Sequence, residues 1–223
     1  VVLKHDHAIL DGGSYTITTD KVVLCTNGFE SIKIFNESGL DVDTKFHHLV
    51  RGAIGYMSGY LEKMNKPPTA ISYITDAPIH VDDPYAEEPY FYLTRRVYEY
   101  EKGTHHNLIS IGGPELRLDD RTPYSPDSDF PDEMMQKIDS FVKKTYDTEP
   151  NKKIEYQFTW HGLMGYTRNG VRLVGMEPKN KVLMYNLGCN GIGILPSVCG
   201  GKRIADIVGG ATLGPSIFDV PVK

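Results

Sequence analysis

The stretch that most constrains the fold of this chain is an apolar run followed by a glycine-rich turn and a second apolar run. Residues 181–186 have the composition of a strand, and residues 188–193 (Gly-Cys-Asn-Gly-Ile-Gly) form a turn signal. Pro196 suits a first helical position, residues 197–208 predict a helix, and the glycine pair at 209–210 marks its end. Such a turn presents unpaired backbone N–H groups and the positive end of a helix dipole, which suits a phosphate or a delocalised anion. A tight turn without a ligand fits the same pattern.

Composition narrows the class of protein. The chain has 223 residues, of which 40% are hydrophobic, enough for one large domain or two small ones. A net charge of −5 without a basic block argues against nucleic acid as a partner. No apolar run approaches the roughly 20 residues of a membrane span. The cysteines Cys25, Cys189 and Cys199 lack metal-ligand spacing, so we expect no metal site and a reduced compartment, cytoplasmic or organellar.

The N-terminal part of the sequence predicts short strands. Residues 14–19 and the fully apolar residues 22–25 are strand-like, and we expect a β-meander that leads into a buried strand at 22–25. That strand ends in Thr26-Asn27-Gly28, where glycine permits close backbone approach to a ligand, although an ordinary Asn-Gly turn has the same residues. Residues 30–45 predict a short helix and a loop. His47 and His48 are expected on the surface.

The middle of the chain predicts a sheet and one helix. Residues 60–69 are linker-like, and residues 132–146 have the apolar spacing of an amphipathic helix. Alternation in residues 90–97 places Tyr90 and Tyr92 on one face and Arg95 on the other. Those tyrosines suit either a substrate pocket or cross-strand packing. The further strands that we expect are residues 70–75, 79–81, 108–111 and 154–160. A glycine pair ends the strand at 108–111.

Several of these segments resemble the FAD-dependent amine and amino-acid oxidoreductases of the D-amino-acid oxidase type. This superfamily (DAO) includes glycine oxidase, sarcosine oxidase and D-amino-acid dehydrogenase. Residues 26–28 resemble its second flavin motif, and residues 49–52 (Leu-Val-Arg-Gly) resemble the element that opens its substrate domain. The C-terminal signature is matched, in the family's order, by Trp160, Gly162, Thr167, Arg168, Asn169, Gly170, Val174, Gly175, Gly188 to Gly193, Gly200, Ala205 and Asp206.

The resemblance implies a mixed α+β or α/β fold with two interleaved domains. Residues 1–45 would form part of the FAD-binding domain, with the β-meander and the buried strand. Residues 46–159 would form a substrate domain with a large mixed β-sheet. Residues 160–223 would return to the glutathione-reductase-like FAD-binding domain and supply the flavin-edge turn and the C-terminal helix.

The N-terminal Rossmann βαβ unit of this family is missing from the sequence, since no Gly-x-Gly-x-x-Gly follows an N-terminal strand. Position 1 would fall about halfway along a typical member. We therefore expect a C-terminal fragment of a longer enzyme, whose partner is the missing N-terminal FAD-binding half. On its own, the fragment is expected to bind FAD weakly and to be inactive.

The chemistry implied by the resemblance is the oxidation of an amine or amino acid by hydride transfer to flavin N5. No catalytic base is assigned. The residues implied in FAD binding are Thr26, Asn27, Gly28, Trp160, Gly162, Gly188, Asn190, Gly191, Ile192, Gly193, Ile194 and Leu195. Those implied in substrate binding are Arg51, Tyr90, Tyr92, Arg95, Trp160, Met164 and Tyr166.

Two departures from the family bear on the substrate and the cofactor. Met164 stands where glycine oxidase and its relatives carry an arginine for the substrate carboxylate. A carboxylate would then meet Arg51 or Arg95, or the substrate lacks one. No cysteine lies between Trp160 and Leu187, so FAD is expected to bind non-covalently. The alternative to an enzyme is a flavin-less binding or accessory module of the same fold.

Overall fold

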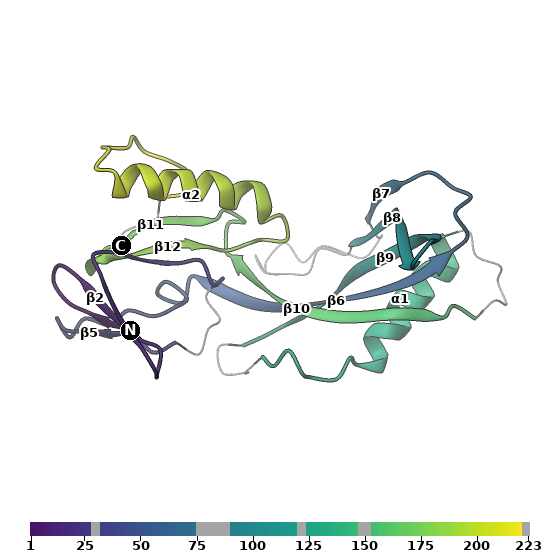
Figure 1. Cartoon of the computed structure of the whole chain (residues 1–223), viewed down its shortest axis with the longest axis horizontal. Coiled ribbons are helices and arrows are strands. Elements are labelled where there is room, and N and C mark those ends of the chain that lie inside the picture. The colour runs from purple at the N-terminus through teal and green to yellow at the C-terminus, as the bar shows by residue number, and fades with distance from the viewer. Residues whose placement is uncertain (28–31, 75–89, 120–123, 147–152, 220–223) are drawn as a thin grey trace. The chain divides into compact units, whose positions relative to one another are not determined.

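The computed structural model describes residues 1–27, 32–74, 90–119, 124–146 and 153–219, which belong to two compact units (Figure 1). Unit 1 comprises Val1–Ala53, Leu118–Asp120 and Met164–Lys223, and unit 2 comprises Ile54–Arg117 and Arg121–Leu163. The main boundaries lie at 53/54 and 163/164, beside the expected 45/46 and 159/160. Which ligand each domain binds stays a prediction.

Unit 1 contains two small sheets and a helix (Figure 1). One sheet has the order β3-β2-β1-β5, formed by β1 (Val2–Leu3), β2 (Ala8–Asp11), β3 (Thr16–Thr19) and β5 (Phe35–Asn36). The other has the order β11-β12-β4, formed by β4 (Val22–Leu24), β11 (Leu173–Glu177) and β12 (Asn180–Leu187). Helix α2 (Ile194–Val208) packs on β11 and β12. The strand, glycine turn and helix predicted for residues 181–208 are therefore present.

The predicted β-meander is wrong in its last strand. β4 leaves the β2–β3 hairpin and pairs in parallel with β12, with Val22 opposite Leu183 and Leu24 opposite Tyr185. As an edge strand of its sheet, β4 buries Val22 and Leu24 while Val23 is 37% exposed, so the strand is not fully buried. Pairing between residues so distant in sequence has no local signal.

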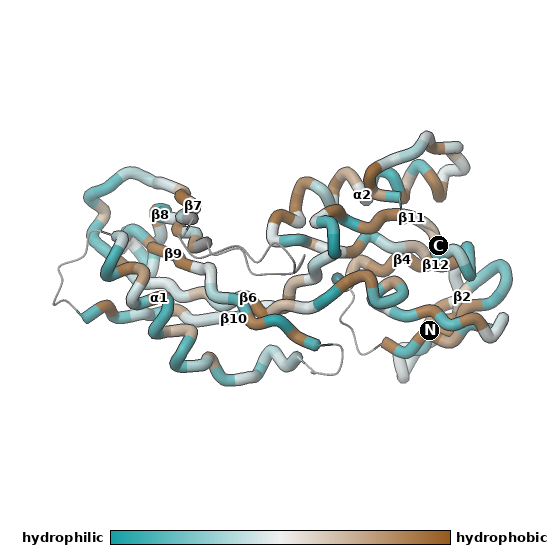
Figure 2. Tube along the Cα trace, turned by 180° about the vertical axis from the view of Figure 1, so that it is seen from behind, coloured by the Kyte–Doolittle hydropathy of each residue, from teal (hydrophilic) through white to brown (hydrophobic). Residues whose placement is uncertain are grey.

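The core of unit 1 lies between its sheets and under α2. Figure 2 shows hydrophobic segments along β4, β11 and β12, where this core gathers. Its buried members include Leu3, Ala8, Val22, Leu24, Phe46, Val50, Leu173, Val182, Leu183, Tyr185 and Leu187. On the other side of the three-stranded sheet, Ile204 of α2 packs against Val174 and Met184.

Residues 32–49 form turns around β5 and no helix among the part described, so the short helix expected there is wrong. Side chain to backbone bonds explain this, because Asn36 Nδ2 donates to the Leu40 carbonyl at 3.0 Å and its Oδ1 accepts from Ser38 N at 3.4 Å. Such bonds offer the backbone an alternative to a helix. The segment ends in three consecutive left-handed residues, Phe46, His47 and His48, with φ of 50°, 53° and 60°.

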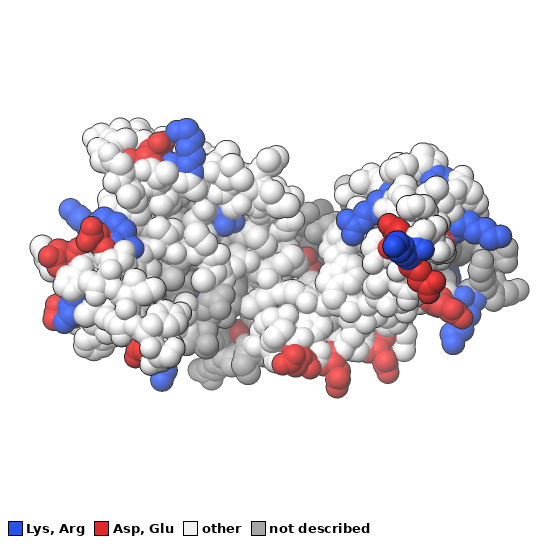
Figure 3. Space-filling view, in the orientation of Figure 1, with Lys and Arg blue, Asp and Glu red and all other residues white. Residues whose placement is uncertain are grey.

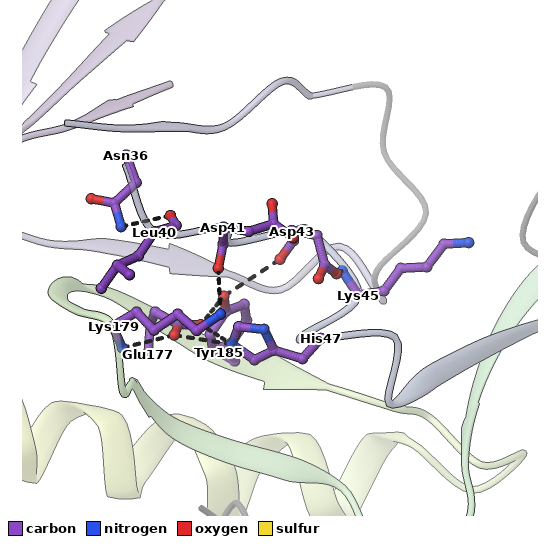
Figure 4. A network of polar contacts seen from close by, with 9 residues as sticks. All are labelled: Asn36, Leu40, Asp41, Asp43, Lys45, His47, Glu177, Lys179 and Tyr185. Atoms are coloured by element: carbon purple, nitrogen blue, oxygen red, sulfur yellow. Dashed lines mark hydrogen bonds and ion pairs between the residues drawn. The ribbon is translucent and has the colours of Figure 1, made fainter. Parts of the chain in front are cut away.

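A buried carboxylate network holds this left-handed turn (Figure 4). Glu177 has no exposed surface, and His47 Nε2 lies 3.0 Å from each of its carboxylate oxygens. Tyr185 Oη donates to Glu177 Oε2 at 2.7 Å, and Lys179 N donates to Oε1 at 2.9 Å. Burial, and then the bond to Glu177, raise the pKa of Tyr185. His47 keeps 28% of its side chain exposed despite this network, and His48 is exposed, so both reach the surface as expected.

Unit 2 is built on a five-stranded sheet of order β10-β6-β9-β8-β7, to which β6 and β10 also bring residues of unit 1. The strands are β6 (Val50–Glu62), β7 (Thr69–Ile74), β8 (Tyr90–Glu101), β9 (Thr104–Arg117) and β10 (Tyr156–Thr167). The linker-like stretch 60–69 shrinks to 63–68 because strands occupy both its ends. β9 also runs through the glycine pair at 112–113 instead of ending there. The strand expected at 79–81 lies outside the described residues.

Helix α1 (Asp132–Thr145) covers one face of this sheet through Ile138 and Val142, as its apolar spacing predicted. Asp132 and Glu133 lie in its first turn and two lysines in its last, where each sign is favoured by the helix dipole. The face shown in Figure 3 carries small, separate groups of acidic and basic side chains. Neither α1 nor α2, the helices of the described part, has the length and apolar character needed to cross a membrane.

Candidate functional site

Three segments of unit 1 meet at the end of β12. Asn27, just after β4, has a left-handed φ of 64°, and its Oδ1 accepts hydrogen bonds from Gly188 N at 3.2 Å and Cys189 N at 3.1 Å. A Cβ on Gly165 would lie 2.6 Å from the Asn27 carbonyl oxygen, so glycine there allows β10 to approach this residue. The side chain of Asn27 thereby fixes the start of the glycine turn.

Asn190 fixes the middle of the turn against β10. Its backbone N donates to the Gly165 carbonyl at 3.0 Å, and its Oδ1 accepts from Thr167 N at 2.8 Å and Thr167 Oγ1 at 3.2 Å. Asn190 also has a left-handed φ of 49°. The turn is therefore held by two asparagines in a conformation that few other residue types adopt readily.

Arg172 lies under the same turn and was not predicted. Its side chain is 8% exposed, and its Nη1 donates to the Gly188 carbonyl at 3.1 Å. Nη2 donates to the Asn186 carbonyl at 2.8 Å, and Nε donates to Asn186 Oδ1. Burial lowers the pKa of the Arg172 guanidinium, and the nearby thiols of Cys189 and Cys25 act in the opposite direction. Asn186 in turn donates to the Ser197 carbonyl of α2 at 3.1 Å, so Arg172 ties β12 to the start of the helix.

We call residues 188–195 the amide turn, because four of its N–H groups have no acceptor among the described residues. Ile192 N donates a hydrogen bond to the Cys189 carbonyl at 3.1 Å. Among the described residues, the amides of Gly191, Gly193, Ile194 and Leu195 have no hydrogen-bond partner. The side chains of Ile192, Ile194 and Leu195 are 75%, 81% and 77% exposed. The amide turn thus presents donors beside exposed apolar groups, which suits a flat ligand with an electron-rich edge.

The remaining residues predicted for the cofactor are Thr26, Gly28, Trp160 and Gly162. Thr26 Oγ1 is buried without a partner, and Gly28 lies outside the described residues. Trp160, on β10 in unit 2, is 41% exposed. A Cβ on Gly162 would meet no atom within 4 Å, so the space around it does not require glycine.

The residues predicted for the substrate divide between the units. Arg51, Met164 and Tyr166 belong to unit 1, where Arg51 is exposed and the other two are half-buried. In unit 2, the ring of Tyr92 covers Gly112, where a Cβ would lie 2.3 Å from it, and burial raises the pKa of Tyr92. Tyr90 begins β8, but its side chain lies outside the described residues.

Arg95 is held by partners within unit 2. It is 9% exposed, its Nε donates to Tyr146 Oη at 2.9 Å, and its Nη1 donates to the Pro67 carbonyl at 3.2 Å. Glu62 Oε1 lies 3.4 Å from Nε as a counter-ion. These contacts give Arg95 a structural role, and none of them supports the substrate role predicted for it. The described segments contain no cluster of three or more His, Cys, Asp or Glu side chains that could hold a metal ion.

The fold is that of flavin-dependent amine and amino-acid oxidases. A glycine oxidase from Bacillus cereus matches with a TM-score of 0.56 at 18% identity, over 92% of this chain and 47% of that one. NikD, described as an unusual amino acid oxidase essential for nikkomycin biosynthesis, matches with a TM-score of 0.61 at 13% identity, over 96% of this chain and 51% of that one. A fructosamine oxidase from Aspergillus fumigatus has a TM-score of 0.54 at 14% identity, over 91% of this chain and 44% of that one.

The chain thus spans about half the length of these structures. A search of curated proteins returned no match. The model of the FAD dependent oxidoreductase family, DAO, matches residues 3–207. The chain therefore belongs to the DAO family of FAD-dependent oxidoreductases.

Proposed function

We propose that this chain supplies the flavin-edge part of an FAD-dependent oxidoreductase that oxidises an amine or amino acid, and that the N-terminal FAD-binding half belongs to a longer protein. The observation that carries the proposal is the amide turn, whose unpaired donors lie beside exposed apolar side chains. A flavin has an apolar ring system and an electron-rich pyrimidine edge, so both features of the turn have a counterpart in this cofactor.

The residues of the amide turn fit a flavin in a defined way. The amides of Gly191, Gly193, Ile194 and Leu195, with the helix dipole of α2, would meet negative charge at N1 and O2 of the flavin. Asn27 and Asn190 would contribute by holding the turn in shape, since their side chains are already occupied by backbone groups. When bound, the flavin supplies the acceptor for a hydride from the carbon next to the substrate nitrogen.

The proposed substrates are amines and amino acids, which also appear in the names of the structural neighbours. Of the two arginines considered for a substrate carboxylate, Arg51 is exposed, whereas Arg95 is nearly buried beside Glu62. We therefore assign the carboxylate, where the substrate has one, to Arg51. Loss of flavin absorbance under anaerobic conditions with a set of amines and amino acids would identify the substrate, and an R51M variant would selectively weaken binding of those with a carboxylate.

An FAD titration followed by flavin fluorescence tests the proposal. The proposed longer protein should bind FAD tightly, and this chain alone only weakly. In the longer protein, I194P removes one donor at the first position of α2, where proline is tolerated, and should weaken FAD binding about tenfold. The matched control I194A keeps the amide and should have a smaller effect. Failure of the longer protein to bind FAD would refute the flavoenzyme and leave the accessory module.

A further inference from the structure

Arg172 carries a fixed positive charge inside unit 1. A guanidinium stays protonated in proteins, and this one is 8% exposed. All three of its hydrogen bonds go to neutral oxygens, on Asn186 and Gly188. Within the residues that the structure describes, no carboxylate forms an ion pair with it, and the titratable groups that face it are the thiols of Cys189 and Cys25.

Arg172 differs in this respect from two other arginines of the chain that are largely buried. Arg95, similarly buried, has Glu62 as its counter-ion, and Arg203 on α2 has Asp219. A buried ion is costly unless an opposite charge or several hydrogen bonds compensate it. The three carbonyl and amide contacts of Arg172 supply the hydrogen bonds but leave the charge itself uncompensated.

The position of Arg172 relates this charge to the amide turn. Its Nη1 holds the Gly188 carbonyl, and Asn186, its other partner, holds the Ser197 carbonyl in the first part of α2. The carbonyl oxygens at the base of the turn thus point toward the guanidinium, while the amides of Gly191, Gly193, Ile194 and Leu195 lack partners among the described residues. The positive charge therefore lies beside the turn that carries the unpaired donors, and both favour a negative ligand there.

We propose that Arg172 is a positioning residue that also tunes the flavin: it orders the amide turn and supplies the charge that favours an anionic flavin ring over a neutral one. This inference rests on the proposed function. It predicts that Arg172 affects flavin chemistry that creates negative charge at N1, beyond any effect on folding.

Sulfite binding to the oxidised holoenzyme measures this effect without turnover. The sulfur lone pair of sulfite attacks flavin N5, an N5–S bond forms, and the electron pair released from the flavin C=N bond gives negative charge at N1 and O2. No further oxidant or reductant is needed. The dissociation constant of this adduct, read from flavin absorbance, therefore reports the electrostatics of the ring edge.

Two substitutions separate the charge of Arg172 from its hydrogen bonds. R172Q keeps an amide donor but removes the charge, and it should weaken sulfite binding about tenfold, whereas R172K keeps the charge and should stay within about threefold of the parent. R203Q removes an equal charge from α2 that Asp219 already neutralises, and it should leave sulfite binding unchanged. The flavin reduction potential should fall in R172Q and not in R203Q.

A second pair of variants covers the case in which R172Q does not fold. C189D would place a carboxylate beside Arg172 and neutralise it while all three arginine bonds remain, so sulfite binding should weaken relative to C189S. Equal sulfite affinity in R172Q, R203Q and the parent would overturn the inference while FAD binding upheld the flavoenzyme. Equal losses in R172K and R172Q would also overturn it, because charge would then not matter. Absence of FAD from the parent protein would instead refute the proposed function.

Discussion

Among its described residues, unit 1 has two buried charged side chains of opposite sign, Arg172 just before β11 and Glu177 at the end of β11. The two differ in the partners that surround them. Glu177 has no exposed surface and is surrounded by His47, Tyr185 and the backbone amide of Lys179 (Figure 4). Arg172 is almost as buried, yet its partners are neutral oxygens. We call the cluster around Glu177 the closed cluster, because the carboxylate finds its partners within the chain. We call the cluster around Arg172 the open cluster, because it leaves a charge and nearby donors for a ligand.

This difference distinguishes a structural polar network from a binding one. In a structural network, every charged or polar group finds its partner within the chain, and removing a member leaves others unsatisfied. In a binding network, hydrogen bonds within the chain fix the shape of the site, and selected groups are left for the ligand. Substitutions in the two clusters should therefore affect stability and flavin binding in different proportions.

The largest expected effect is on the closed cluster. E177L leaves His47 and Tyr185 without their buried acceptor, and the free energy of unfolding should fall by about 3 to 5 kcal/mol. Urea denaturation followed by circular dichroism measures this loss.

E133A is the control for E177L, because Glu133 is an exposed residue of α1 whose pairing with Lys137 should be worth less than about 0.5 kcal/mol. A loss for E177L as small as that for E133A would show that the carboxylate cluster contributes little to the fold.

The next effect concerns the packing of α2 on the open cluster. A Cβ on Gly200 would lie 2.5 Å from Asn186 Oδ1, which Arg172 and the Ser197 carbonyl hold in place. G200A should therefore cost about 2 to 3 kcal/mol and weaken FAD binding, because α2 must shift.

The neighbouring helical glycine provides the matched control. A Cβ on Gly201 would meet nothing within 4 Å, so G201A should raise the free energy of unfolding by up to about 1 kcal/mol. Thermal and urea unfolding measure the stabilities of G200A and G201A. Similar stabilities for the two variants would contradict the close packing at Gly200.

A smaller effect is expected at two buried tyrosines. Y185F removes the bond to Glu177 and should cost about 1.5 to 2 kcal/mol. Tyr60, 7% exposed, has a hydroxyl without a hydrogen-bond partner in the described part of the chain, so Y60F should be neutral or stabilising by up to about 1 kcal/mol. Equal destabilisation by the two substitutions, measured by urea unfolding, would argue against the bond from Tyr185 to Glu177.

The last prediction concerns the dependence of stability on alkaline pH. Burial raises the pKa of Tyr185 and Tyr60 above the ordinary value of 10.0, so the folded state retains protons that the unfolded state releases. This contribution to stability is complete below pH 10 and is lost as the pH rises above it, by at most about 1.4 kcal/mol per unit for each tyrosine. Urea unfolding between pH 9 and 11 should show this decline, and Y185F should reduce its slope. A parent whose stability did not change over this range would contradict the prediction.

Local patterns in the sequence predicted the elements that depend on neighbouring residues. The apolar spacing in Asp132–Thr145 predicted α1, and the strand, turn and helix around Gly188 were predicted from turn chemistry. The helix expected within residues 30–45 is absent from the described part, 32–45, because the side chain of Asn36 caps turns there. Propensity cannot reveal such competition unless the bonded partners are known.

Contacts between distant residues were not predictable in the same way. His47 and Glu177 are 130 positions apart, and nothing near either residue indicates the other. Arg172 bonds to main-chain and amide oxygens, which leave no charge pattern in the sequence. Asn27 and the glycines and Asn190 of the amide turn were found because the resemblance to the family identified them, whereas Arg172 lies outside that signature.

The left-handed turn at Phe46, His47 and His48 has a consequence for the order of folding. For each of these non-glycine residues, the left-handed conformation costs about 1 to 2 kcal/mol. The contact between His47 and Glu177 offsets this cost, and it forms only when Glu177 is in place. Glu177 belongs to the β11–β12 hairpin, 130 positions further along the chain. We therefore expect this turn to form late, after the β11–β12 hairpin, so residues 46–48 would reach their final conformation only after residues 173–187 have left the ribosome.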